Sequence, residues 1–242
     1  MPSEIAPEVN DVIILRRWRY QESHTILRGL SRNMGILGFI VKDNYKNPAK
    51  SSVARLTYPG AALQAKWKKR KNTDLLLLLT ATPIISQWNT IANPEKYTQA
   101  LYISECLDKF LITDYKDSEE YFVEALSKLE EIEYQKLNPL LPIIFLRQLC
   151  RIAGIAPTTI RKKSHDVFDL KEASWIPPEK SGELTLTKEI SENWYKIFTE
   201  TAPPIFSAEE RRILLETMIK YVSIHHSPRF ELKSPHVIMS LF

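Results

Sequence analysis

The sequence predicts an α+β protein, in which a small β-barrel is followed by an all-helical domain. Residues 1–85 carry short β-rich runs separated by turn signals. From Pro94 onward, apolar residues instead recur at helical spacing. Charge separates the same regions, because residues 1–90 hold 14 Lys and Arg against 6 Asp and Glu. We therefore expect one domain at 1–85 and a second at 86–242.

Five short strands account for the predicted barrel. Val12–Leu15 is an apolar run, and the runs Thr25–Leu30 and Ile36–Lys42 flank the turn signal NMG, which predicts a hairpin. Ala61–Trp67 and Leu75–Thr82 form a second hairpin around KKRKNTD. Strands of this number and spacing fit an OB-fold barrel. Because the leucine run lacks clean alternation, we expect the fifth strand to be buried on both faces, between the barrel interior and the helical domain.

The helical domain is predicted from apolar stripes, and its helices cover YTQALYISECLDKFL, EEYFVEALSKLEEI, NPLLPIIFLRQLCRI and residues 187–198, 208–225 and 234–241. The third stretch is apolar on most sides, so we expect it to be the central helix, with Gly154 and Pro157 as its stop signal. Ser207 and Glu210 form a capping box before a later helix. Residues 158–182 lack this periodicity, and we expect an irregular insertion with a small sheet.

Composition excludes several classes of protein. Cys106 and Cys150 lie far apart in apolar helical patterns, which predicts two small buried side chains rather than a disulfide. No apolar run reaches the roughly 18 residues that a transmembrane helix needs. The N-terminal segment MPSEIAPEVND is acidic and polar, unlike a secretion signal. We therefore expect a cytoplasmic protein.

We find no constellation that would make the chain an enzyme. Phosphate-binding glycine loops, nucleophile elbows and zinc-protease motifs are all missing from the sequence. His225 and His226 end a predicted helix, where a cation favours the helix dipole, and adjacent helical residues make a poor metal site. We expect no catalytic residues, no metal and no cofactor.

The basic N-terminal third has two interpretations, a site for a polyanion or a solvated surface. Nucleic-acid binding needs cations for phosphates and exposed aromatic rings for bases. The segment RRWRY supplies both, but on a strand Trp18 and Tyr20 share one face, so we expect at least one of them in the core. Trp67 is open to either role. The candidate DNA-binding residues are Arg16, Arg17, Arg19, Lys42, Lys46, Lys50, Arg55, Lys68, Lys69, Arg70 and Lys71.

Several motifs occur in a fixed order along the chain. Y-x-E-S spans Tyr20–Ser23, LSRNMG ends the following strand, and Lys42 and Asp43 end the next. AGIAP closes the central helix, FDLKEASWIP lies in the insertion, and RFELKSPHVI lies in the tail. Over almost the whole chain this ordered set resembles the RecO family of bacterial DNA-repair proteins, with an insertion similar to that of the Bacteroides-like branch.

The chain departs from the RecO pattern at two places. Many relatives carry a four-cysteine zinc element after the central helix, whereas residues 158–182 contain no cysteine. The resemblance therefore implies a member of the family without zinc. The usual glycine after the basic strand is Asp43 here, which places an acid beside the presumed DNA surface.

The resemblance implies a recombination mediator rather than an enzyme. Such proteins bind single- and double-stranded DNA, anneal complementary strands and help to load RecA onto DNA coated by single-strand-binding protein. Their partners are RecR and the acidic tail of single-strand-binding protein, and we expect a nucleoid-associated location. Arg147 and Arg151 are the candidate cations for that tail, although Arg151 could equally form an interhelical ion pair. The alternative functions are an RNA-binding barrel protein and an adaptor whose basic face meets an acidic protein.

Overall fold

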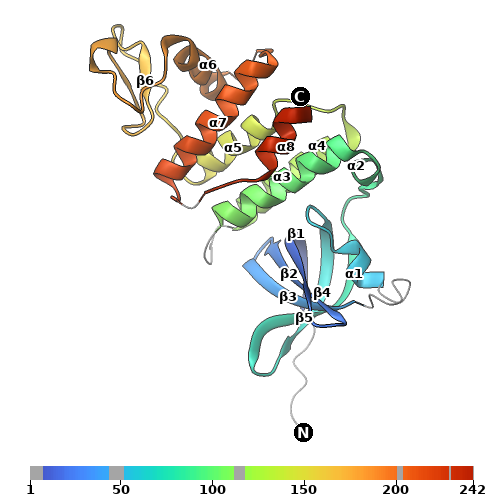
Figure 1. Cartoon of the computed structure of the whole chain (residues 1–242). Coiled ribbons are helices and arrows are strands. Elements are labelled where there is room, and N and C mark those ends of the chain that lie inside the picture. The colour runs from blue at the N-terminus through green and yellow to red at the C-terminus, as the bar shows by residue number, and fades with distance from the viewer. Residues whose placement is uncertain (1–7, 44–51, 112–117, 201–203, 229, 242) are drawn as a thin grey trace. The chain divides into compact units, whose positions relative to one another are not determined.

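The computed structural model describes residues 8–43, 52–111, 118–200, 204–228 and 230–241 (Figure 1). The chain divides into two compact units, Met1–Leu137 and Asn138–Phe242. The first contains a five-stranded barrel with helices packed on it, and the second is helical with a small two-stranded sheet. The predicted α+β class is therefore confirmed.

A closed barrel forms the N-terminal part of the first unit. Its strands are β1 (Glu8–Tyr20), β2 (His24–Ser31), β3 (Gly35–Lys42), β4 (Ala62–Arg70) and β5 (Thr73–Pro83). Their order is β1-β2-β3-β5-β4, and antiparallel pairing of β1 with β4 closes the sheet. Only β3 and β5 pair in parallel among these strands. A closed five-stranded barrel of this kind is the expected OB-fold, and both predicted hairpins are present.

The barrel interior is filled by alternating side chains from every strand. Phe39 and Trp67 meet there edge to face, with ring centroids 5.4 Å apart. The tight β2–β3 and β4–β5 connections use positive φ at Gly35 and Asn72, which glycine and asparagine tolerate best. This chemistry explains why each hairpin turns where the sequence indicated.

The leucines of β5 are less buried than the sequence analysis predicts. Leu76 and Leu78 point into the core, whereas Leu75, Leu77 and Leu79 are only half-buried. The expected burial on both faces is wrong, because α3 (Pro94–Phe110) packs on β1, and α4 (Ser118–Tyr134) packs on β2 and β3. Alternation therefore persists in β5 although its residue type is uniform.

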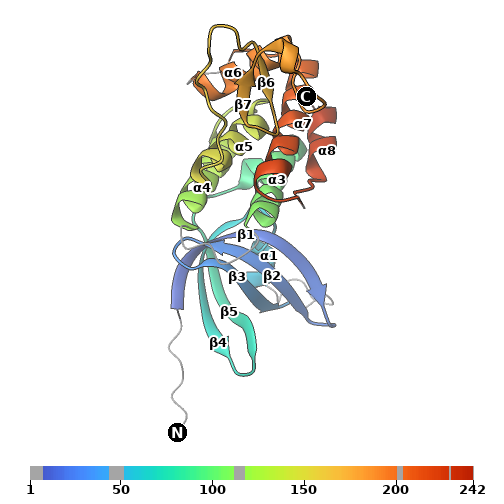
Figure 2. The same ribbon diagram turned by 90° about the vertical axis from the view of Figure 1, so that its left-hand side faces the viewer.

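Helices complete the first unit. The short α1 (Ser52–Leu56) contributes Ala54 to the barrel core, and α2 (Trp88–Ala92) precedes α3. Figure 2 shows α3 next to β1, and α4 contacts β2 and β3. These helices and the barrel thus belong to one compact unit, and that unit ends at Leu137. The division into domains at residue 85, expected from the sequence, stays a prediction.

The second unit contains the remaining predicted helices. They are α5 (Leu141–Ile152), α6 (Lys188–Thr199), α7 (Ala208–His225) and α8 (Ser234–Leu241), with a short 3₁₀ helix at Pro178–Lys180. The Ser207–Glu210 capping box forms as predicted, and Gly154 adopts a φ of +69° just after α5. Cys150 on α5 is fully buried, as is Cys106 in the first unit.

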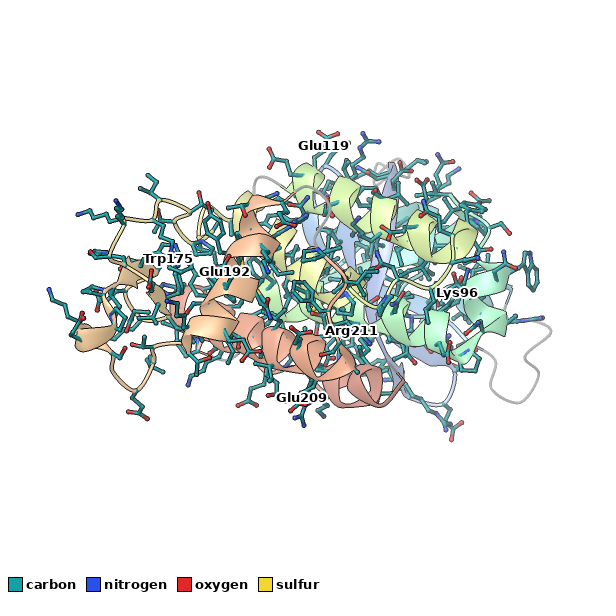
Figure 3. All side chains as sticks on the ribbon, turned by 90° about the horizontal axis from the view of Figure 1, so that it is seen from above. Lys96, Glu119, Trp175, Glu192, Glu209 and Arg211 are labelled. Carbon is teal, nitrogen blue, oxygen red and sulfur yellow. The ribbon has the colours of Figure 1, made fainter. Side chains whose placement is uncertain are left out.

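The insertion is a two-stranded sheet, β6 (Val167–Asp169) and β7 (Ser174–Ile176). Arg161 anchors it, since its guanidinium stacks 4.9 Å from the ring centre of Trp175 and donates a 2.8 Å hydrogen bond to Glu192 on α6. Figure 3 shows Trp175 and Glu192 close together in this region. The predicted small sheet is confirmed, and a cation between an aromatic ring and a carboxylate fixes it to the helices.

Candidate nucleic-acid interface

The tip of the β4–β5 hairpin is the most basic feature of the barrel. Lys68, Lys69, Arg70 and Lys71 are all exposed there. Lys69 lies 3.9 Å from the carboxylate of Glu8, which is a weak surface pair. In OB-folds, this loop and the β1–β2 loop flank the face that binds oligonucleotides. The basic hairpin therefore lies where an OB barrel contacts nucleic acid.

The end of β1 presents aromatic rings outward. Trp18 and Tyr20 are each 42% exposed, so the expectation that at least one lies in the core is wrong. The reason is a β-bulge between Ile14 and Arg16, which reverses the faces of all later β1 residues. After the bulge, Arg17 pairs with the core residue Leu27, and the neighbouring Trp18 faces out.

Cations surround these rings on the outer face of the sheet. The guanidinium of Arg16 lies 5.7 Å from the ring centre of Trp18, in cation–π geometry. Tyr20 pairs with His24 on β2, which in turn pairs with the exposed Lys42 on β3. We call the set Arg16, Trp18, Tyr20, His24 and Lys42 the outer aromatic face. It combines stacking surfaces with positive charge.

Trp67 takes the opposite role. Its side chain is 0% exposed and packs against Phe39 inside the barrel. A base cannot stack on a ring that is enclosed by the barrel, so Trp67 is a core residue. Trp67 lies four residues before the hairpin tip, at a position of β4 whose side chain points into the barrel, and this explains its burial.

The remaining candidate cations lie in different settings. Arg19 and Arg55 are exposed, on β1 and α1 respectively. Lys46 and Lys50 lie outside the described residues. Arg17 donates a 2.6 Å hydrogen bond to the carboxylate of Asp43, which is only 6% exposed. The acid expected beside the DNA surface is thus largely buried and paired, and a DNA contact by Arg17 stays a prediction.

The comparisons with known proteins agree with this geometry. Residues 8–86, which span the barrel, match the family model described as Recombination protein O N terminal. The chain is also 24% identical over 249 residues to the DNA repair protein RecO of Porphyromonas gingivalis strain ATCC 33277, which covers 97% of this chain and 98% of the relative. The RecO of strain W83 gives the same identity and coverage. The resemblance to the RecO family is confirmed.

In the second unit, the two arginines assigned to a RecO partner hold the end of α6. Arg147 is 6% exposed and donates to the carbonyl oxygens of Ile197, at 2.9 Å, and Glu200, at 3.3 Å. Arg151 is more exposed and donates to the carbonyl of Phe198 at 2.9 Å. Cations at a helix C-terminus satisfy its last carbonyls. A partner contact by either arginine stays a prediction.

Sequence reasoning missed a shallow apolar pocket in the same unit. Arg211 and Arg212 flank it, and it is lined by Pro139, Pro142, Ile143, Ala208, Leu215 and Ile238. Arg212 is exposed, whereas Arg211 donates to the carbonyl of Phe206. The adjacent arginines, one turn after a capping box, are the signal that could have identified it. An apolar pocket with a basic rim suits an acidic, apolar peptide.

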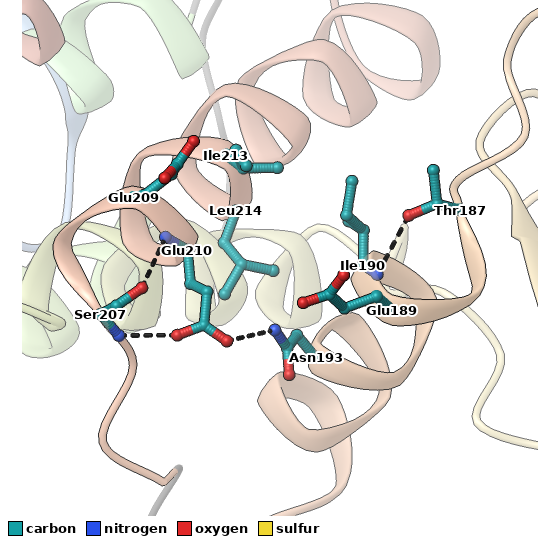
Figure 4. A pocket seen from close by; sticks show the side chains of 9 residues that line it. All are labelled: Thr187, Glu189, Ile190, Asn193, Ser207, Glu209, Glu210, Ile213 and Leu214. Carbon is teal, nitrogen blue, oxygen red and sulfur yellow. Dashed lines mark hydrogen bonds between the residues drawn. The ribbon is translucent and has the colours of Figure 1, made fainter.

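A larger pocket, of about 390 Å³, opens between the N-terminal ends of α6 and α7 (Figure 4). Glu189, Glu209 and Glu210 line it, and Glu210 also accepts a 3.0 Å hydrogen bond from Asn193. Carboxylates repel phosphate, so this pocket is a poor DNA contact.

No group of three or more His, Cys, Asp or Glu side chains within the described ranges could hold a metal ion. Among the helices in those ranges, none combines the length and apolar character needed to cross a membrane.

Proposed function

We propose that the protein is a DNA repair and recombination mediator that binds DNA through the outer aromatic face and the basic β4–β5 hairpin. The observation that carries this proposal is that the barrel exposes two aromatic rings, Trp18 and Tyr20, and a run of cations at the β4–β5 hairpin. An OB barrel binds oligonucleotides through its β1–β2 and β4–β5 loops and the strands between them. Similarity over 97% of the chain to proteins described as DNA repair protein RecO supports the same role.

The proposed mechanism is electrostatic and breaks no covalent bond. Lys42, Arg16 and the hairpin cations neutralise phosphates, which releases counterions and lowers the repulsion between two strands. Trp18 and Tyr20 offer ring faces to unpaired bases. Complementary single strands held in this way anneal more readily, and duplex DNA is held by phosphate contacts alone.

The proposed partners are RecR, single-strand-binding protein and, indirectly, RecA. The pocket between Arg211 and Arg212 supports a contact with the acidic tail of single-strand-binding protein, because it pairs an apolar floor with a basic rim. Arg151 remains a further candidate for that tail. Arg147 would act there only through the C-terminal end of α6, because its guanidinium donates hydrogen bonds to the carbonyl oxygens of Ile197 and Glu200 at that end.

The test is a salt titration of single-stranded DNA binding. A phosphate clamp predicts that log K falls with log salt at a slope of roughly −0.7 per neutralised phosphate. Replacing Lys68, Lys69, Arg70 and Lys71 with alanine should make the slope shallower by about two to three units, at about 0.7 per contact. The control replaces Lys162 and Lys163, which are exposed in the second unit, and should leave the slope unchanged. A flat slope for the wild-type chain would overturn the proposal.

Two further measurements separate the alternative functions. A strong preference for RNA over DNA of the same sequence would favour an RNA-binding protein, because only RNA carries the 2′-hydroxyl. Strand annealing with single-strand-binding protein that lacks its acidic tail tests the partner contact. Annealing that does not depend on the tail would contradict that contact, and leave the DNA clamp in place.

A further inference from the structure

A single guanidinium joins three elements at one end of the barrel. Arg17 on β1 donates through Nη2 to Oδ2 of Asp43 at 2.6 Å, and through Nη1 to the carbonyl oxygen of Ala54 on α1 at 2.8 Å. Asp43 follows β3 directly and also accepts a 3.0 Å hydrogen bond from Thr25 on β2. Its backbone N–H donates to the carbonyl of Ser23 at 2.8 Å. The network therefore links β1, β2, the residue that follows β3 and α1.

The side chains of Arg17 and Asp43 are less exposed to solvent than those of the neighbouring cations. The side chain of Asp43 is 8% exposed and that of Arg17 is 30% exposed, whereas Arg16, Lys42 and Arg55 are exposed. A hydrogen-bonded ion pair in this setting compensates the charge of Arg17 internally. Arg17 is therefore poorly suited to act as a phosphate ligand, although it lies in the RRWRY segment.

The acceptors in the network lie next to two candidate DNA-binding cations. Lys42 immediately precedes Asp43, and Arg55 immediately follows Ala54. We propose that Arg17 and Asp43 are a positioning pair, which sets where Lys42 and Arg55 present their charges without touching DNA. This inference rests on the proposed function, since it concerns the same DNA interface.

The two possible roles of Arg17 predict opposite changes in DNA affinity when the carboxylate of Asp43 is removed. If Arg17 were a phosphate ligand that Asp43 merely competes for, removing the carboxylate would free a cation, and DNA would bind more tightly. If the pair positions Lys42 and Arg55, Asp43→Asn should instead weaken binding, by about three- to tenfold as for residues coupled in one network. The slope of log K against log salt should differ from that of wild type by less than roughly 0.7, the change expected when one phosphate contact is lost.

The experiment measures single-stranded DNA affinity over a salt series for Arg17→Gln, Asp43→Asn and the double variant. We expect each single variant to weaken binding, and the double variant to be no weaker than the worse single variant, because both changes break the same network. Arg16→Gln is the matched control on the same strand, and its slope should become shallower by about 0.7. The positioning role would be overturned if Asp43→Asn bound DNA more tightly than wild type. It would also be overturned if the salt slope of Arg17→Gln became shallower by the roughly 0.7 expected for one lost phosphate contact.

Arg17→Lys keeps the test decisive if the uncharged variants unfold. Lysine preserves the charge but cannot reproduce the two-pronged geometry that reaches Asp43 and Ala54 together. A positioning role predicts that lysine fails to restore affinity, and a phosphate ligand predicts that it succeeds. A wild-type chain that does not bind DNA would overturn the proposed function as well as the pair. Normal wild-type binding with full rescue by lysine would overturn the pair alone.

Discussion

Arg28 on β2 forms an ion pair with Asp108 on α3, and its second amino group donates to the carbonyl oxygen of Leu111 at 2.7 Å. One side chain of the barrel thus satisfies the C-terminal end of the helix that packs on β1. The Arg28 side chain is 24% exposed and that of Asp108 is 10% exposed, so the pair is largely withdrawn from water.

Arg28→Ala should therefore destabilise the first unit. Loss of hydrogen bonds to a charged, mostly buried partner costs about 1.5–3 kcal/mol. Urea unfolding followed by circular dichroism measures the change. Arg16→Ala, on the exposed face of β1, should stay within about 0.5 kcal/mol of wild type. Equal stability of the two variants would mean that the barrel and α3 do not depend on this pair.

Two tryptophans of the barrel should respond in opposite ways to alanine substitution. Trp18→Ala should leave stability within about 0.5 kcal/mol of wild type, but weaken single-stranded DNA binding by about 1–3 kcal/mol, the usual contribution of base stacking. Trp67→Ala should destabilise the fold by about 3–5 kcal/mol, because it empties the barrel core.

Thermal unfolding and DNA titration, performed on both tryptophan variants, measure these effects. Duplex DNA is the internal control, because its stacked bases cannot use the Trp18 ring. A Trp18→Ala variant with wild-type affinity for single strands would contradict the stacking role, and leave the phosphate contacts as the whole interface.

Elements with a clear local signal could be predicted from the sequence. The bounds of α7 and α8 follow from a capping box and from apolar periodicity, both of which act within a few residues. The hairpin turns at Gly35 and Asn72 are likewise local, since residues that tolerate positive φ mark them. The barrel strands and the longer helices could therefore be assigned without knowledge of long-range contacts, whereas the short α1 and α2 were not predicted.

The composition of the DNA interface could not be predicted in the same way. A single bulge near Ile14 decides whether Trp18 or Arg17 faces the core, and nothing in the sequence of that strand marks it. Arg17 meets Asp43 across 26 positions of sequence, and Arg147 meets Ile197 across 50. Charge alone does not distinguish an arginine that is paired internally from one that faces solvent.

Arg147 gives a prediction for the second unit. Arg147→Met should destabilise it by about 1–3 kcal/mol, because the carbonyl oxygens of Ile197 on α6 and of Glu200, which follows α6, lose a donor. Arg212→Ala, at an exposed position, should leave stability within about 0.5 kcal/mol of wild type. Binding of a peptide with the acidic tail sequence should fall for Arg212→Ala. If only the Arg147 variant lost peptide binding while remaining folded, the pocket flanked by Arg211 and Arg212 would not be the tail site.

Glu133 on α4 should make the stability of the first unit depend on pH. It is 3% exposed, and its carboxylate accepts hydrogen bonds from the backbone of Asn89 at 3.0 Å and from the backbone and hydroxyl of Thr90, both at 2.8 Å. Burial raises the pKa of this carboxyl, but these hydrogen bonds at the start of α2 outweigh it, so the pKa is lowered below the ordinary value of 4.5.

A lowered pKa means that the ionised form of Glu133 stabilises the fold. Its contribution is fully present above pH 4.5, the ordinary value, and is lost as the pH falls through the lower folded value. At pH 7, Glu133→Gln should therefore cost about 1–3 kcal/mol, as for other buried hydrogen-bonded groups. The difference between wild type and variant should shrink below pH 4.5. Urea unfolding at several pH values measures it, and parallel stability curves down to strongly acidic pH would show that the charge on Glu133 does not support α2.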